Sequence, residues 1–228
     1  MENLWLDIAP KAVCISTTDS VDRRRKCAAE FGRVGLKHYT FVVNDKDPID
    51  GIRGCFMAHK NVVLDAYLNG YEKLLVFEDD ILFDSVENVR KGLTNVKSLI
   101  KSNDDSWDII YLGHAAMSPL YVSNLHEGIV SSNDLRYMHA IVWSRKGMAI
   151  FLNMEFKEGQ LDTAVAKNTN AYAPYPMIAY QNDMSASGTY TIWYNILIYL
   201  RGIVSATTLC KTFEKVFFCM GKLSTMIK

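Results

Sequence analysis

Three adjacent carboxylates, Glu78, Asp79 and Asp80, stand between two apolar runs in residues 73–83 (KLLVFEDDILF). A carboxylate removed from water is costly unless it is paired or binds a metal ion. The pattern predicts a strand that leaves the core at Phe77 and presents the acids at its carboxyl end, where open α/β sheets bind ligands. Such oxygens suit a hard divalent cation carrying phosphate groups. An acidic turn with solvated side chains is the alternative, and the acids alone do not exclude it.

A nucleoside diphosphate would need a metal ion against its pyrophosphate, and Asp80, with Glu78 or Asp79 nearby, can supply the ligands. The base and ribose would need a pocket, which the polar loop after the first predicted strand can form. The candidate contacts in that loop are Ser16, Thr17 and Thr18.

A cation for the diphosphate can come from the arginine run at residues 23–25, with Arg24 as the candidate. Only one or two of three consecutive helical arginines can face one site. His59 lies in residues 54–61, which are predicted to open a helix, and helix N-termini favour anions. His59 is therefore a candidate to contact phosphate or the acid cluster, and an interior histidine with satisfied hydrogen bonds is the alternative.

Asp162 stands where it can cap a short helix at residues 159–167. The functional alternative is a general base that deprotonates an attacking hydroxyl group. His139 is interpreted as a core residue in preference to a metal ligand. Gln181 lies in a predicted loop over residues 174–188 and can belong to a sugar pocket or to a solvated segment.

Strands and helices alternate in the first half of the chain, which favours an α/β fold with a mostly parallel central sheet. Later strand-like runs are short and predict a small antiparallel addition. The predicted strands cover residues 12–16, 39–43, 74–77, 108–112, 121–122, 128–130 and 138–143, and the predicted helices cover residues 22–31 (capped by Asp22), 55–68, 86–100 and 144–154.

Composition excludes several classes of protein. With 49% hydrophobic and 22% charged residues, the 228-residue chain is typical of a globular domain. Its formal net charge of zero provides no global field for nucleic acid, so no such partner is expected. The five cysteines form no CxxC pair, so neither a zinc site nor a disulfide framework is predicted. With no signal peptide and no apolar run of membrane-spanning length, we expect a cytoplasmic location.

The tail changes character from residue 190 onward. We expect a domain over residues 1–190 and a C-terminal helical extension over residues 191–228, with apolar residues at helical spacing between 213 and 223. Packing of this helix on the domain is the favoured interpretation. Contact with a membrane surface or a further domain is the alternative.

Seven segments between residues 12 and 187 resemble, in this order, glycosyltransferase family 25, the lipopolysaccharide-type and collagen-type galactosyltransferase relatives. A lone EDD would be weak evidence, but the ordered set is fairly specific. The segments are STTDSVDRRRK, GCFMAHKNVV, LLVFEDDILF, DIIYLGH, HAIVWSRKG, QLD and YAPYPMIAYQNDMS.

The resemblance implies a GT-A fold and transfer of a hexose from a nucleotide-sugar, usually a UDP-sugar, to a glycan or glycoprotein, with Mn²⁺ or Mg²⁺. It implies that Asp162 is the base of an inverting reaction. It implies that Glu78, Asp79 and Asp80 form a DxD-like signature in which Asp80 holds the metal, and Glu78 and Asp79 hold the metal or the ribose.

The sequence departs from the family pattern at two positions: Ala58 replaces the usual serine before the motif histidine, and Trp143 replaces a smaller residue. These departures weaken the inference about the substrate more than the inference about the sugar donor. The compact chain is also similar to glycosyltransferases of large DNA viruses that decorate capsid protein. In that setting it would be one domain of a longer polypeptide in the host cytoplasm.

Two rival functions come from other classes. One is a catalytically inactive module that binds a sugar-nucleotide or glycan, against which the intact acid trio argues. The other is a phosphotransferase with an aspartyl nucleophile, which would place its acids after the first strand instead of the third.

Overall fold

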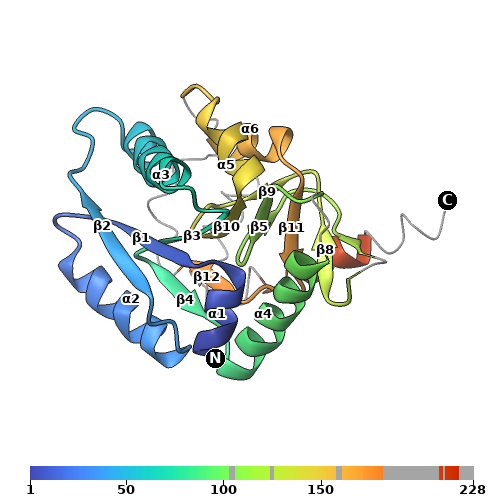
Figure 1. Cartoon of the computed structure of the whole chain (residues 1–228). Coiled ribbons are helices and arrows are strands. Elements are labelled where there is room, and N and C mark those ends of the chain that lie inside the picture. Colours follow the sequence, from blue (N-terminus) through green and yellow to red (C-terminus); the bar gives the residue numbers. More distant parts are fainter. Residues whose placement is uncertain (103–105, 124–125, 158–160, 182–210, 213, 221–228) are drawn as a thin grey trace.

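The computed structural model describes residues 1–102, 106–123, 126–157, 161–181, 211–212 and 214–220. An eight-stranded sheet in the order β2-β1-β3-β10-β5-β11-β8-β7 runs through the middle of the molecule (Figure 1). Its strands are β1 (Lys11–Thr17), β2 (Tyr39–Asn44), β3 (Lys73–Glu78), β5 (Ile109–Tyr111), β7 (Tyr121–Val122), β8 (Ile129–Ser131), β10 (Ala140–Ser144) and β11 (Ala171–Pro174).

Strand directions confirm the predicted class. The pairings of β1 with β2 and β3, and of β5 with β11, are parallel, whereas β10 and β8 are antiparallel to their neighbours. Six strands therefore run one way (β2, β1, β3, β5, β11 and β7) and two run the other (β10 and β8). The chain is an α/β protein with a mostly parallel central sheet and antiparallel additions.

Helices cover both faces of the sheet. The helices are α1 (Glu2–Ile8), α2 (Val21–Arg33), α3 (Gly51–Leu68), α4 (Val86–Lys101), α5 (Arg145–Leu152) and α6 (Leu161–Asn168). One apolar cluster packs α1, α2 and α4 against one face, and a second packs α3, α5 and α6 against the other (Figure 1). Along β3 the residues alternate between the two clusters, with Leu75 and Phe77 in the first and Leu74 and Val76 in the second.

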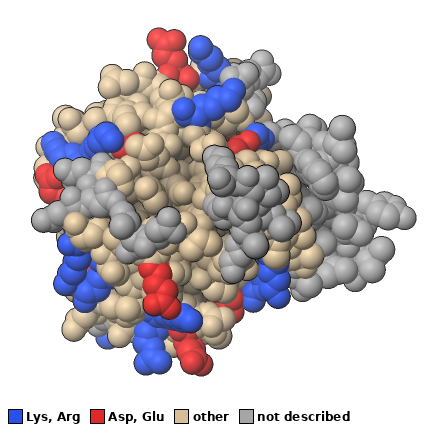
Figure 2. Space-filling model, turned by 90° about the vertical axis from the view of Figure 1, so that its right-hand side faces the viewer, with Lys and Arg blue, Asp and Glu red and all other residues tan. Residues whose placement is uncertain are grey.

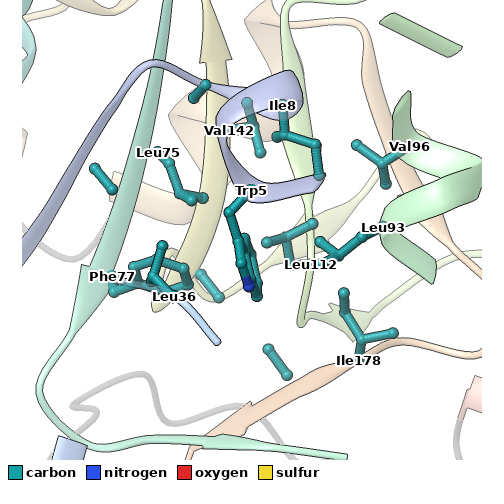
Figure 3. Packing of buried hydrophobic residues seen from close by; sticks show 14 of the residues in the cluster. Trp5, Ile8, Leu36, Leu75, Phe77, Leu93, Val96, Leu112, Val142 and Ile178 are labelled. Atoms are coloured by element: carbon teal, nitrogen blue, oxygen red, sulfur yellow. The ribbon is translucent and has the colours of Figure 1, made fainter. Parts of the chain in front are cut away.

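Trp5 is the centre of the first cluster. Its ring is fully buried among Phe77, Leu93 and Leu112, and its indole N–H donates to the Val34 carbonyl at 3.0 Å (Figure 3). Burying a side chain of this size stabilises the fold by about 2–3 kcal/mol. Helix α1, which was not predicted, is therefore held by tertiary packing.

Three local expectations are corrected. Helix α3 begins at Gly51, because the Asp50 carboxylate accepts from the N–H groups of Ile52 and Arg53. His59 therefore lies in the interior of the helix, and the anion-binding N-terminus predicted near it is elsewhere. Asp22 lies in the first turn of α2 instead of capping it.

Part of the predicted loop at residues 174–188 is a strand. β12 (Ala179–Gln181) pairs antiparallel with β4 (Ile81–Phe83), directly after the acids. A second small sheet joins β6 (Ala115–Ala116) to β9 (Leu135–Arg136). Because β12 fixes the apolar run that follows Asp80, the acids are held between two anchored strands.

The described part of the C-terminal segment is helical and packs on the domain. Glu214 is buried and accepts from the Met177 N–H at 2.7 Å, and Phe218 stacks on Tyr175 with ring centroids 3.8 Å apart. These contacts favour the packed interpretation over an exposed amphipathic helix. The predicted domain boundary at residue 190 lies outside the described residues.

On the face at the right of Figure 1, the acidic and basic side chains of the described residues are interspersed (Figure 2). Among the described residues, no helix combines the length and the apolar character that a membrane crossing requires.

Candidate functional site

A cavity of about 590 Å³ opens at the carboxyl ends of β1 and β3. That volume falls within the range of small-molecule sites, and the position is where α/β sheets bind ligands. Seven of the residues singled out from the sequence line it: Ser16, Thr17, Glu78, Asp79, Asp80, Asp162 and Gln181. Thr18, Arg24 and His59 are not among its lining residues.

The side of the acids toward α2 is rich in oxygen and guanidinium groups, and we call Ser16, Arg23, Asp79 and Asp80 the arginine side. The Ser16 hydroxyl donates to Asp79 Oδ2 at 2.5 Å. Arg23 Nη1 lies 3.3 Å from Asp79 Oδ1, and its Nη2 donates to Asp80 Oδ2 at 3.0 Å. Because 38% of the Arg23 side chain is exposed, it can reach a ligand in the cavity as well as the acids.

Asp80 is incompletely satisfied by these partners. Its Oδ1 is buried and has no hydrogen-bond partner among the described residues. Burial and the charges of Glu78 and Asp79 raise the pKa of Asp80 to about 7, and Arg23 opposes them only in part. A hard divalent cation would supply the missing positive charge and a partner for Oδ1, so the donor set fits such an ion.

The side of the acids toward α3 is different, and we call Cys55, His59 and Glu78 the histidine side. His59 Nε2 lies 3.1 Å from Glu78 Oε1, and the Cys55 thiol donates to the same oxygen at 3.8 Å. Gln181 Nε2 donates to Glu78 Oε2 at 3.4 Å. Burial alone would raise the pKa of Glu78, but the hydrogen bond and charge of His59 bring it below its usual value.

The three consecutive arginines take three different roles. Arg24 donates to the Ser16 hydroxyl at 3.0 Å and to the backbone carbonyls of Thr17 and Thr18, so it supports the loop. Arg25 pairs with Asp22 on the exposed face of α2. Arg23, which the sequence did not single out from its neighbours, is the one that faces the acids, because successive helical residues point about 100° apart.

Asp162 lines the cavity from the first turn of α6. Its Oδ2 accepts from the Tyr137 N–H at 3.3 Å, and Tyr137 has a positive φ of 74°. That left-handed backbone is uncommon for a tyrosine and aims its N–H at the carboxylate. Burial raises the pKa of Asp162 to about 6, with the charge of Glu78 as a further cause.

His139 is a buried residue immediately before β10, as the core interpretation predicted. Burial lowers the pKa of His139 to about 4, and burial with the neighbouring His139 lowers that of His114 to about 3. Both imidazoles are therefore neutral at pH 7. The His139 carbonyl accepts from the Glu78 N–H at 2.9 Å, which fixes the backbone where the acids begin.

Comparison with known proteins finds no matching family model. Among curated proteins, the chain is 28% identical over 123 residues to rat "Probable inactive glycosyltransferase 25 family member 3", covering 52% of this chain and 20% of the relative. It is 36% identical over 66 residues to the human inactive member 3, covering 29% and 11%. It is 28% identical over 119 residues to zebrafish procollagen galactosyltransferase 1, covering 51% and 19%. The chain spans about a fifth or less of the length of these relatives.

Solved structures are more distant. A Thermus thermophilus protein described as mannose-1-phosphate geranyltransferase aligns over 75% of each chain with a TM-score of 0.47 and 11% identity. A glycosyltransferase involved in glycosylation of the major capsid of PBCV-1 covers 62% of this chain and 63% of its own, with a TM-score of 0.35 and 13% identity. The matches to curated proteins bear out the resemblance seen in the motifs: about half of this chain is similar to part of members of glycosyltransferase family 25.

Proposed function

We propose that the chain is a divalent-metal-dependent glycosyltransferase that moves a hexose from a UDP-sugar to a hydroxyl group of a glycan or glycoprotein. One observation carries the proposal: a single cavity joins Asp80, whose buried Oδ1 lacks a described partner, to Asp162, whose pKa is raised to about 6. Asp80 would serve the sugar donor and Asp162 the acceptor hydroxyl, and sugar transfer requires both groups at one site.

The donor half rests on the arginine side. Asp80, with Asp79 beside it, would hold Mn²⁺ or Mg²⁺, which when bound stabilises the negative charge of the departing diphosphate. Arg23 would exchange a carboxylate for a phosphate oxygen, a charge-assisted hydrogen bond that Arg makes well. Ser16 and Thr17 would line the nucleoside, and the Ser16 hydroxyl fixes Asp79 in place.

The acceptor half rests on Asp162. A general base works best with a pKa near the operating pH, and a carboxylate with a pKa of about 6 is both ionised and more basic than usual at pH 7. In an inverting reaction, Asp162 takes the proton of the acceptor hydroxyl as it attacks the anomeric carbon. In a retaining reaction, it would instead bind the acceptor.

A catalytically inactive binding module is the second candidate. Arg23 already pairs with both Asp79 and Asp80, so a side chain supplies part of the charge that a metal ion would bring. The rat and human relatives bear the word "inactive" in their names.

The test is a thermal-shift screen of UDP-, GDP- and dTDP-sugars with and without Mn²⁺, followed by measurement of UDP release. A ligand that binds only the folded state raises Tm by mass action. We expect a shift that requires UDP-sugar and Mn²⁺ together, with UDP release that Asp162→Asn abolishes.

Asp22→Asn is the matched control, because Asp22 is an exposed acid on α2 that pairs with Arg25 outside the cavity. A UDP-sugar shift without turnover under any condition would establish the binding module. Absence of a shift with every nucleotide-sugar would refute the transferase and leave a module that binds a glycan.

A further inference from the structure

The histidine side gathers a thiol, an imidazole and a carboxylate around one point between α3 and the end of β3. Cys55 and His59 are four residues apart and therefore share one face of α3. One ligand atom from each of Cys55, His59 and Glu78 lies within 4.8 Å of the other two. Two of these separations converge on Glu78 Oε1, at 3.1 Å from His59 Nε2 and 3.8 Å from Cys55 Sγ.

The two distances to Glu78 Oε1 are close to the edges of a zinc tetrahedron. Nitrogen, oxygen and sulfur ligands at about 2.0–2.3 Å from one Zn²⁺ lie about 3.3–3.6 Å from each other. The two distances to Glu78 Oε1 differ from that range by only a few tenths of an ångström, and the separation of the Cys55 and His59 ligand atoms lies within 4.8 Å. We propose that Cys55, His59 and Glu78 form a site for Zn²⁺ or a similar thiophilic divalent metal, separate from the hard-cation position at Asp80.

The chemistry of the ligands separates the two positions. Thiolate and imidazole favour zinc-like ions, whereas Mg²⁺ and Mn²⁺ favour the oxygen donors of the arginine side. Cys55 and Glu78 also line the cavity, so the proposed metal position borders it. Three protein ligands with one open position leave room for a water molecule or a ligand oxygen.

Binding at this position releases the thiol proton of Cys55. Burial and the charge of Glu78 keep the pKa of the Cys55 thiol well above its usual value, so the metal must displace the thiol proton to solvent as the metal–sulfur bond forms. If His59 carries its proton on Nε2, that proton moves to Nδ1, which has no partner among the described residues. Affinity for the metal is therefore expected to increase with pH.

Titration of the EDTA-treated full chain with Co²⁺ tests the proposal, because a cobalt–thiolate bond gives a charge-transfer band in the near ultraviolet. We expect that band, its loss in Cys55→Ser, and Zn²⁺ binding at least about 100-fold weaker in that variant, since even outer-shell losses cost about 10- to 100-fold. Cys219→Ser removes an exposed thiol and should retain the band.

The Asp80→Asn variant should also retain the band, because its carboxylate belongs to the other position. No band in the wild-type chain would overturn the proposal, as would loss of the band in Cys219→Ser or Asp80→Asn. If Cys55→Ser does not fold in EDTA, His59→Gln replaces it and must weaken Zn²⁺ binding comparably. No sugar-nucleotide is present in these measurements, so their outcome is independent of the proposed transferase activity.

Discussion

The arginine side and the histidine side treat adjacent carboxylates in opposite ways. On the arginine side, Asp80 keeps a buried oxygen without a described partner, and its pKa is raised to about 7. On the histidine side, both oxygens of Glu78 accept hydrogen bonds, and its pKa lies below the usual value. Asp80 therefore lacks a full set of protein partners, whereas Glu78, two residues before it, has a protein partner for each oxygen.

The largest expected effect is a loss of activity on substitution of Asp80. Asp80→Asn should lower kcat/KM for UDP-sugar by about 100- to 1000-fold, since it removes the charge that holds the cation opposite the diphosphate. Steady-state UDP release at saturating Mn²⁺ measures it. A variant with unchanged turnover and metal dependence would remove Asp80 from the donor site.

The same variant should be more stable than the wild type at neutral pH, although it is less active. A carboxylate whose folded pKa of about 7 exceeds its unfolded value near 3.8 binds protons more tightly in the folded state. The wild-type chain therefore loses stability as pH rises from about 4 to about 7, and Asp80→Asn loses less. Urea unfolding in EDTA at pH 5 and pH 8 compares the two, with Asp22→Asn expected to follow the wild type.

On the histidine side, the expected loss is one of stability. His59→Ala leaves a largely desolvated Glu78 without its main partner and should lower the free energy of unfolding by about 2–3 kcal/mol. Urea unfolding at pH 7.5 measures the change. His59→Gln keeps a donor for Glu78 and should recover most of it; equal losses in both variants would mean that cavity formation is the cause.

Two arginines of α2 are expected to differ in effect, Arg23 at the acids and Arg25 on the exposed face. Arg23→Gln should weaken UDP binding about tenfold, the equivalent of about 1.4 kcal/mol for one charge-assisted hydrogen bond. Arg25→Gln should stay within about 0.5 kcal/mol, because exposed ion pairs contribute little. Calorimetric titration of UDP with Mn²⁺ distinguishes them, and equal effects would show that both act through general charge.

The smallest expected effect is the influence of Glu78, on the histidine side, on the pKa of Asp162. Because this base must be ionised, kcat/KM should fall to about half at pH 6 and tenfold further for each pH unit below it. The charge of Glu78 contributes to the raised pKa of Asp162, so Glu78→Gln should move this acid limb to lower pH. An unchanged limb in pH–rate profiles would uncouple the two residues.

Hydrophobic periodicity in the sequence was sufficient to predict the first strands of the sheet. It was insufficient to predict the direction in which single side chains point. β1 and β3 are continuous apolar runs that end in polar residues, so their position and the placement of the acids were predictable. α1 is short and depends on the burial of Trp5, and β4 and β12 are strands of three residues that define each other only by pairing. Such elements carry no local signal of their own.

The site shows the same division. The acids and Asp162 were recognisable as motifs, but the choice of Arg23 over Arg24 depends on the rotation of α2 about its axis. Cys55 was not predicted as a site residue, because its partners are His59 in the same helix and Glu78, which lies 23 residues away on another element. Cysteine spacing in the sequence contains no trace of that arrangement.

The position of β10 has a consequence for the order in which the molecule can be assembled during synthesis. β10 lies between β3 and β5, yet it follows both in the chain. Until residue 140 leaves the ribosome, the inner edge of β3, with Leu74, Leu75 and Val76, has no strand beside it. Unpaired apolar edges promote association with other chains, so a nascent polypeptide would have to shield β3 until β10 joins the two halves of the sheet.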